Sequence, residues 1–413
     1  MESPIPAVPV RRAALVFIFF TVLLDILAFG LIIPVLPHLL KQFAGGDVAQ
    51  ATIWHGLFAT GFMVMQFFMT PVQGALSDRY GRRPVILVSN LGLAVDFLIM
   101  ALAQTLPLLF IGRLLSGITS ASFSTANAYI ADVTPPEKRA AAFGKLGMAF
   151  GLGFTLSPVF GAWLGETHLR APFYVAAGLC FANFCYGLFV LPESLPPERR
   201  AAFDWKRANP LGSLKLLRGH PELFALASVS FLMGLAHLVY PTTFVLYADY
   251  RFGWGLTMVG WTLLIVGVLQ IIVQGGLIGR IVKALGERRA LLFGCGMGTL
   301  GFTLYGLAPT GYWLWAALPI TAFWAVANPA AQALMTQHVS PQEQGRLQGA
   351  IASLNSIAGI IGPSLFTHTF AIVAQAHVHD FWAGLTFWLA AGMVGLGGFI
   401  AWRSTRAGHP MAR

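Results

Sequence analysis

Long apolar runs alternate with short polar segments along the whole chain. A run of about 20 apolar residues is enough for a helix to cross the hydrocarbon core of a bilayer. Twelve such runs occur, at 13–37, 54–75, 84–104, 107–130, 141–165, 170–191, 222–248, 257–281, 290–308, 312–336, 345–371 and 379–402. The pattern predicts an all-α integral membrane protein with a six-helix bundle at 1–191, a polar linker at 192–221 and a second six-helix bundle at 222–413.

Composition agrees with this pattern. Of the 413 residues, 56% are hydrophobic and only 10% are charged, and the mean hydropathy is +0.71. Soluble domains carry roughly a quarter charged residues, so a soluble class is excluded. No metal-ligand set, nucleophile–base pair or phosphate-binding loop is found, so neither an enzyme nor a bound cofactor is expected. The three cysteines lie in apolar runs and predict packing rather than disulfides.

The net charge of +10 reflects membrane topology rather than nucleic-acid binding, because the basic residues lie in short loops between apolar runs. With the N-terminus in the cytoplasm, the cytoplasmic segments hold 22 of the 26 Lys and Arg residues. The outer loops hold only Lys41, Arg170 and Arg251, and Arg113 lies inside the fourth span. The asymmetry predicts that both termini and the linker face the cytoplasm. The linker itself is expected to be a solvated connection with a short amphipathic piece.

The two halves of the chain repeat one another at an offset of 205 residues. GALSDRYGRRP at 74–84 aligns with GRIVKALGERR at 279–289, PEKRAAAFG at 136–144 aligns with PQEQGRLQG at 341–349, and Pro158 aligns with Pro363. Both halves would begin on the same side of the membrane, which predicts parallel repeats. In such folds the substrate site lies near the midplane between the halves, and transport proceeds by rocking one half against the other.

The loop between the second and third spans carries a distinctive pattern of glycines and charges. Gly74, Asp78, Arg79, Gly81, Arg82 and Arg83 form the pattern G-x3-DR-x-GRR. This loop resembles the signature loop of the major facilitator superfamily. The resemblance implies the fold of that superfamily, with two parallel six-helix repeats, and a role for the loop in conformational gating. We expect Asp78 to lie beside a helix N-terminus and the arginines to reach acids on neighbouring helices. The alternative is that the arginines only determine topology.

The fifth span is rich in small residues, which allow helix backbones to approach closely in lipid. Gly147, Gly151, Gly153, Pro158 and Gly161 resemble the antiporter motif of the superfamily. Ser157 and Ala162 stand where that motif has glycines. The alternative is ordinary packing between spans.

Four stretches resemble the tetracycline-efflux branch of drug/proton antiporters: LDILAFGLIIPVLP, GALSDRYGRRPVILVS with AVDFLIMA, GRLLSGIT with AYIADVTPPEKRAAAFG, and LGERRALLFG with LQGAIASL and GIIGPSLF. The resemblance implies a monomeric, multi-pass protein of the bacterial inner membrane. It would export a tetracycline-like or other amphiphilic drug in exchange for protons, with a divalent metal carried by the substrate. The alternatives are a proton-coupled importer of a sugar or organic acid on the same fold, a membrane enzyme and a non-transporting receptor.

Charged residues at bilayer depth are costly and usually mark a pathway. Asp25, Asp96 and Arg113 lie inside the first, third and fourth spans, and the resemblance implies that such residues take part in proton coupling. Burial disfavours the charged form of a carboxylate, so the acids could bind and release a proton as access alternates. The alternative is a structural Asp–Arg pair that ties the spans together.

The second half carries only His237 as an ionisable residue in the middle of a span. The resembled exporters have a histidine at the position of Gln270 and an acid at the position of Gly298. His237 is the candidate to supply the missing titratable group, or else it packs between helices. Polar side chains inside the spans are the candidates for substrate binding: Gln66, Asn127, Gln270, Gln274, Asn328 and Gln332. Trp261, Trp324 and Phe323 could stack on a planar drug.

Overall fold

A computed structural model describes residues 12–120, 122–201, 214–218, 221–340, 343–376 and 381–406. Within these ranges the chain is almost entirely helical and contains no strand. The helices are α1 (Arg12–Leu31), α2 (Val35–Phe43), α3 (Val48–Tyr80), α4 (Arg82–Leu102), α5 (Leu106–Thr119), α6 (Ser122–Val133), α7 (Pro136–Thr167), α8 (Ala171–Val190), α9 (Lys215–Arg218), α10 (Pro221–His237), α11 (Val245–Phe252), α12 (Leu256–Ile272), α13 (Ile278–Leu307), α14 (Gly311–Ala322), α15 (Ala327–Thr336), α16 (Gln344–Gln375) and α17 (Leu385–Ser404).

The helices agree with the predicted number of membrane crossings. Ten helical segments of the described chain are long and apolar enough to span a bilayer. One of them, Leu256–Leu307, has 52 residues and bends at Gly286, whose φ of 74° lies outside the helical region, so it is long enough for two crossings. The shorter apolar helix Leu106–Thr119 and its successor α6 supply another. The fold class is therefore confirmed as an all-helical membrane protein, and the helices are consistent with twelve crossings.

Two of the breaks that hydropathy did not reveal involve a proline. The first apolar run bends after Leu31, where Pro34 follows a turn closed by the Ile33 N–H and the Gly30 carbonyl, 3.2 Å apart. The seventh contains a π-helical turn at Tyr240–Phe244, which includes Pro241. Proline cannot donate a backbone hydrogen bond, so each break follows from a residue that interrupts the regular helical pattern.

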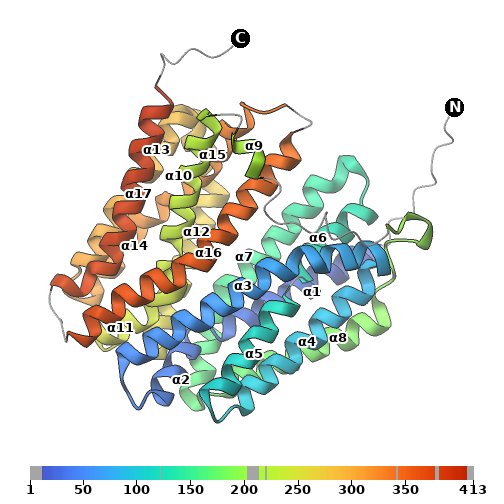
Figure 1. Ribbon diagram of the computed structural model, residues 1–413, viewed down its shortest axis with the longest axis horizontal. Coiled ribbons are helices and arrows are strands. Elements are labelled where there is room, and N and C mark those ends of the chain that lie inside the picture. The colour runs from blue at the N-terminus through green and yellow to red at the C-terminus, as the bar shows by residue number, and fades with distance from the viewer. Residues whose placement is uncertain are drawn as a thin grey trace. The chain divides into compact units, whose positions relative to one another are not determined.

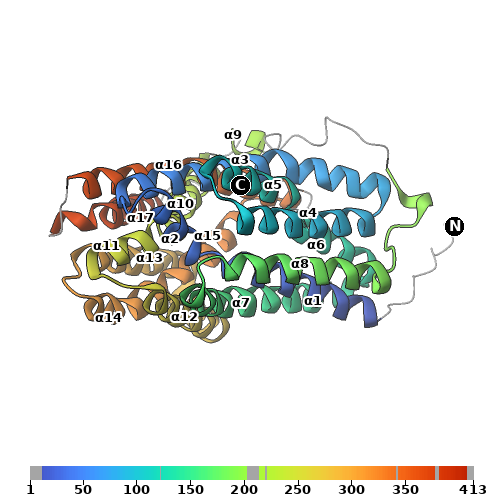
Figure 2. The same cartoon turned by 90° about the horizontal axis from the view of Figure 1, so that it is seen from below.

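The chain forms two compact units. Unit 1 contains Met1–Val35 and Gly61–Asn209, and unit 2 contains Leu36–Thr60 and Pro210–Arg413. In unit 1, α1 packs against α7 and α8, and α4 packs against α5 and α8 (Figure 2). In unit 2, α17 packs against α13 and α10, and α10 packs against α16 (Figure 1). The bundle boundaries drawn from the sequence stay a prediction.

A segment from the first half of the sequence is built into unit 2. Lys41 of α2 forms an ion pair with Asp249 of α11 at 2.5 Å. The buried His55 lies with Nδ1 2.9 Å from the carbonyl oxygen of Thr242. The ion pair and the buried polar contact thus hold residues 36–60 to α11 and to the π-helical turn Tyr240–Phe244.

The glycines of α7 fall into two groups. A Cβ atom at Gly161 would overlap the backbone carbonyl of Leu31, and one at Gly153 would lie 2.8 Å from Ile26, so both positions allow α1 to approach α7. A Cβ atom at Gly147 or Gly151 would meet nothing within 4 Å. Close packing of α1 on α7 therefore depends on Gly153 and Gly161, whereas Gly147 and Gly151 lie on an open face of α7.

Gly161→Ala is expected to destabilise unit 1 by about 1–3 kcal/mol, because the new methyl group would force the α1 and α7 backbones apart. Gly151→Ala adds the same methyl group where there is open space, and serves as the matched control. The melting temperatures of both purified variants in detergent test this prediction. Equal melting temperatures for the two would contradict the assigned contact.

Candidate functional site

Asp25 lies in the middle of α1 and is held by an amide from α8. The Nδ2 group of Asn183 donates to Asp25 Oδ1 at 3.1 Å and to the carbonyl oxygen of Thr21 at 3.2 Å. Asn183 is fully buried, whereas Asp25 is partly buried. The amide therefore fixes the carboxylate against α8, and it is a residue that sequence reasoning missed.

Asp96 lies inside α4 and is fully buried. Its Oδ2 accepts a 2.6 Å hydrogen bond from the hydroxyl of Ser116 on α5, while its Oδ1 has no hydrogen-bond partner. A buried carboxylate that keeps one unsatisfied oxygen is costly when charged and can be neutralised by a proton. Ser116 lies on the same face of α5 as Arg113, one turn later, and that spacing is a signal by which it could have been found.

Arg113 makes contacts different from those of a structural ion pair. Its guanidinium lies over the rings of Phe62, at 4.4 Å from the centroid, and Phe29, at 5.4 Å. Its side chain is buried, its Nε and Nη1 atoms have no hydrogen-bond partner, and it forms no ion pair with Asp96 in the described structure. The charges of Arg113 and Asp96 are near enough to interact, but the alternative of a direct Asp–Arg pair does not hold.

The two acids share a region of unit 1. Cys180 of α8 is fully buried and lies close enough to both Asp25 and Asp96 for their charges to act on its thiol. The structure thus places the predicted proton-coupling residues Asp25, Asp96 and Arg113 in the interior of one unit, on α1, α4 and α5. Whether they carry protons stays a prediction.

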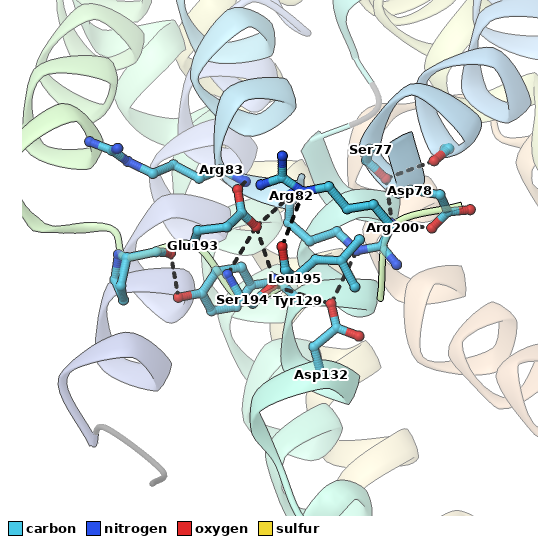
Figure 3. A network of polar contacts seen from close by, with 12 residues as sticks. Ser77, Asp78, Arg82, Arg83, Tyr129, Asp132, Glu193, Ser194, Leu195 and Arg200 are labelled. Carbon is cyan, nitrogen blue, oxygen red and sulfur yellow. Dashed lines mark hydrogen bonds and ion pairs between the residues drawn. The ribbon is translucent and has the colours of Figure 1, made fainter. Parts of the chain in front are cut away.

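The signature loop forms a polar network at one end of unit 1 (Figure 3). Arg82 pairs with Asp78 at 2.6 Å and with Asp132 of α6 at 3.1 Å, and its Nη1 donates to Ser77 Oγ at 2.5 Å. Arg83 donates from Nη2 to the carbonyl oxygen of Leu188 at 2.7 Å. Arg82 therefore reaches an acid on a neighbouring helix, whereas Arg83 reaches a backbone carbonyl, and together these contacts tie the ends of α3, α4, α6 and α8.

The acid that caps α4 is Glu193, not Asp78. Glu193 accepts hydrogen bonds from the backbone N–H groups of Arg82 at 2.8 Å and Arg83 at 3.3 Å (Figure 3). Asp78 lies in the last turn of α3, so its carboxylate reaches the Arg82 side chain instead. The expectation that Asp78 sits at a helix N-terminus is wrong, because Glu193 fills that position and already satisfies the free donors of α4.

The first part of the linker is docked on the signature loop rather than simply solvated. Glu193 also accepts from its own chain, at the N–H groups of Ser194 and Leu195, and Ser194 Oγ donates to Asp132 at 3.2 Å. The N–H of Ala201 donates to the carbonyl of Asp78 at 3.1 Å. Residues 202–213 lie outside the described chain, so the predicted amphipathic piece can be examined only at α9.

Gly81 explains how the carboxylate of Glu193 comes so close to the loop. Its φ of 104° is a conformation that favours glycine, and a Cβ atom there would overlap the Glu193 carboxylate. Gly74 has open space around it, and Arg79 is exposed, with its guanidinium 5.2 Å from the Tyr80 ring. Sequence reasoning missed Glu193. The signal for it was an acid directly after the sixth span, on the same predicted side of the membrane as the basic loop.

In unit 2, His237 lies at the end of α10 beside an aromatic cluster. Its ring centroid is 5.8 Å from that of Trp324 and 6.1 Å from that of Tyr240, and Trp324 is 5.1 Å from Phe302. His237 is exposed within the described structure, whereas Trp324 is buried and therefore not free to stack on a drug. A Cβ atom at Gly298 would lie 2.6 Å from the Trp324 indole, so that ring fills the position where the resembled exporters have an acid.

The amides proposed for substrate binding lie in both units. Gln66 of α3 and Asn127 of α6 are partly buried in unit 1. In unit 2, Gln274 donates to Gln270 at 2.6 Å beside a π-helical turn, Gln332 donates to Gln348 at 3.1 Å, and Asn328 is exposed. Within the described residues no three His, Cys, Asp or Glu side chains form a group that could hold a metal ion. The role of these amides stays a prediction.

Comparisons with known proteins agree with the fold. The family profile described as Major Facilitator Superfamily matches residues 18–363. The chain is 37% identical to the class C tetracycline resistance protein of Escherichia coli, over 92% of this chain and 94% of the relative. It is 34% identical to the class B protein of Escherichia coli, over 88% of each chain.

Solved structures show the same architecture. The human organic anion transporter MFSD10 superposes with a TM-score of 0.68 at 26% identity, covering 95% of this chain and 100% of that one. The nucleoside transporter NupG superposes with a TM-score of 0.78 at 15% identity, over 95% and 99% of the two chains, which shows the fold alone. The chain therefore belongs to the major facilitator superfamily, in the branch of the tetracycline resistance proteins, and is a multi-pass membrane transporter rather than an enzyme.

Proposed function

We propose that the protein exports tetracycline or a related amphiphilic drug across the bacterial inner membrane, in exchange for protons and by alternating access. Both termini would face the cytoplasm, and the proton gradient would supply the energy in place of a cofactor. The relatives named as tetracycline resistance proteins support the class of substrate. The monomer is proposed as the working unit.

The observation that carries proton exchange is the environment of Asp96. This carboxylate is fully buried in α4, receives one hydrogen bond from the neutral Ser116 hydroxyl, and is not neutralised by an ion pair within the described chain. A charge in such surroundings is costly, and proton binding removes the cost. Asp25, held by the neutral amide of Asn183, would be the second proton carrier.

The direction of coupling can be tested in proteoliposomes. An antiporter takes up drug when the vesicle interior is acidic, because protons leave as drug enters. A proton-coupled importer takes up its substrate when the exterior is acidic. Uptake of a tetracycline driven by internal acid is expected, and uptake driven only by external acid would favour the importer. Growth inhibition of an expressing host by a drug panel would identify the substrate.

We expect tetracycline transport to require a divalent cation, since the proposed cargo is a drug–metal complex. Chelation of Mg²⁺ with EDTA should abolish acid-driven uptake, and added Mg²⁺ should restore it. Uptake that persists in EDTA would show that the metal-free drug is carried.

A further inference from the structure

A cavity of about 380 Å³ opens at one end of unit 2, where the segments that join α11 to α12 and α13 to α14 meet. Its lining includes Arg251, Phe252, Trp254, Met258, Tyr312 and Trp315. All these residues flank the ends of apolar spans, so the cavity lies at the level of a membrane–water interface. The predicted topology makes this the outer interface. The proposed drug export does not use the cavity.

Arg251 is the charged residue in this lining, and no described acid neutralises it. It is partly buried, and its buried Nε atom has no hydrogen-bond partner. No described acid forms an ion pair with it, and the neighbouring Asp249 is paired with Lys41 at 2.5 Å. Its polar contact is with the Tyr247 phenol. A cation that is partly removed from water with no described counter-charge is costly, so the cavity favours an anion.

The remaining walls are aromatic and hold fixed positions. The ring of Trp254 lies 5.3 Å from Phe252 and 5.8 Å from Trp315, centroid to centroid. Trp315 Nε1 donates to Thr262 Oγ1 at 2.8 Å, which fixes the indole. A Cβ atom at Gly311 would overlap the Trp254 ring, so glycine is needed for this arrangement. A volume of this size can hold a lipid headgroup but is much larger than a lone phosphate requires.

The mouth of the cavity is apolar as well as open. Tyr312 is 76% exposed and Met258 is 38% exposed, so both side chains are available to hydrocarbon. An occupant must therefore combine an anionic group, to meet Arg251, with an apolar part, to cover the aromatic wall and the mouth. Basic pockets between spans bind anionic lipid headgroups in this way, and aromatic rings at span ends suit the boundary between headgroup and acyl chain.

We propose that this cavity is a binding site for an anionic phospholipid, with the lipid phosphate paired with Arg251 and the glycerol and first methylene groups against Trp254, Trp315 and Tyr312. A charge-assisted contact between guanidinium and phosphate supplies the preference for anionic headgroups. The aromatic wall supplies the preference for a lipid over a free anion.

The test is native mass spectrometry of the full chain purified with defined lipids. Wild-type protein is expected to retain phosphatidylglycerol in preference to phosphatidylethanolamine, and Arg251→Gln is expected to bind phosphatidylglycerol roughly tenfold more weakly. Arg280→Gln removes an exposed arginine outside the cavity and should leave retention unchanged. Melting temperatures of both variants show whether they are folded.

Two results would overturn the proposal. One is equal retention of phosphatidylglycerol by the wild-type protein and a folded Arg251→Gln variant. The other is displacement of the lipid by excess inorganic phosphate, which would mean that the cavity selects a free anion rather than a lipid. Neither result bears on drug export, because acid-driven uptake is measured separately.

Discussion

Asp25→Asn is expected to abolish proton-driven drug accumulation while the protein stays folded. The amide has nearly the same shape as the carboxylate, and its oxygen can still accept the 3.1 Å hydrogen bond from Asn183. The variant cannot release a proton, so binding of drug and of protons would no longer be linked. Exchange of labelled for unlabelled drug, which needs no net proton movement, should continue. In proteoliposomes, the accumulation assay reports proton coupling, and the exchange assay reports whether the carrier can still move drug across the membrane.

Asp47→Asn is the matched control for this prediction. Asp47 is exposed between α2 and α3, where its carboxylate accepts a hydrogen bond from the Gln50 N–H at 3.1 Å. Its loss should leave accumulation close to that of the wild-type protein. If Asp25→Asn accumulates drug at the wild-type rate under internal acid, Asp25 has no part in coupling. If it loses exchange as well as accumulation, its role is structural.

Glu193→Ala is expected to have the second large effect, because one carboxylate holds two segments of the chain together. It caps the N-terminus of α4 through Arg82 and Arg83, and it folds the start of the linker through Ser194 and Leu195. Loss of such a cap costs about 0.5–2 kcal/mol, with more from each backbone donor left unsatisfied. We expect a lower melting temperature, faster proteolysis of the linker, and reduced transport.

Glu198→Ala provides a control within the same linker. Glu198 is exposed in the short helical turn Pro197–Arg199, and it lies five residues after Glu193. Its removal should change neither proteolysis nor transport. Similar cleavage rates for the two variants would contradict the view that Glu193 docks the linker on the signature loop.

Much of the fold could be predicted because span length and loop charge follow directly from the bilayer. Hydropathy indicated the crossings, and the resemblance of the loop at Gly74–Arg83 indicated the superfamily. The bend after Leu31 and the π-helical turn at Tyr240–Phe244 could not be placed in this way. Hydropathy averages over a turn or more of helix, whereas these breaks depend on single prolines and local hydrogen bonds.

The candidate site was predicted in its charged members but not in their partners. Asp25, Asp96 and Arg113 stand out because charges are rare inside spans. Asn183 does not stand out, since neutral polar residues are common there, and only the packing of α8 on α1 brings it to Asp25. The one signal for Ser116 is its spacing of three residues from Arg113 on α5. Sequence spacing cannot reveal contacts between helices that are far apart along the chain.

Position 298 shows how a substitution can be understood only with its neighbours. The sequence alone indicated that Gly298 stands where the resembled exporters have an acid, and it did not show what fills the space of the missing side chain. In the structure the Trp324 indole occupies that space and lies next to His237 and Phe302. A buried aromatic ring therefore occupies the place of the missing acid, which makes the substrate range of this chain the property most worth measuring.

The proposed exchange requires drug and protons to move in opposite directions through one carrier. The most direct measurement uses proteoliposomes with a pH-sensitive dye inside and no imposed pH gradient. When a tetracycline gradient directed into the vesicles is applied with Mg²⁺, we expect the interior to become more alkaline, because protons leave as drug enters, and we expect no such change with Asp25→Asn. Acidification of the interior would contradict the proposed exchange, and an equal alkaline shift with Asp25→Asn would show that Asp25 has no part in it.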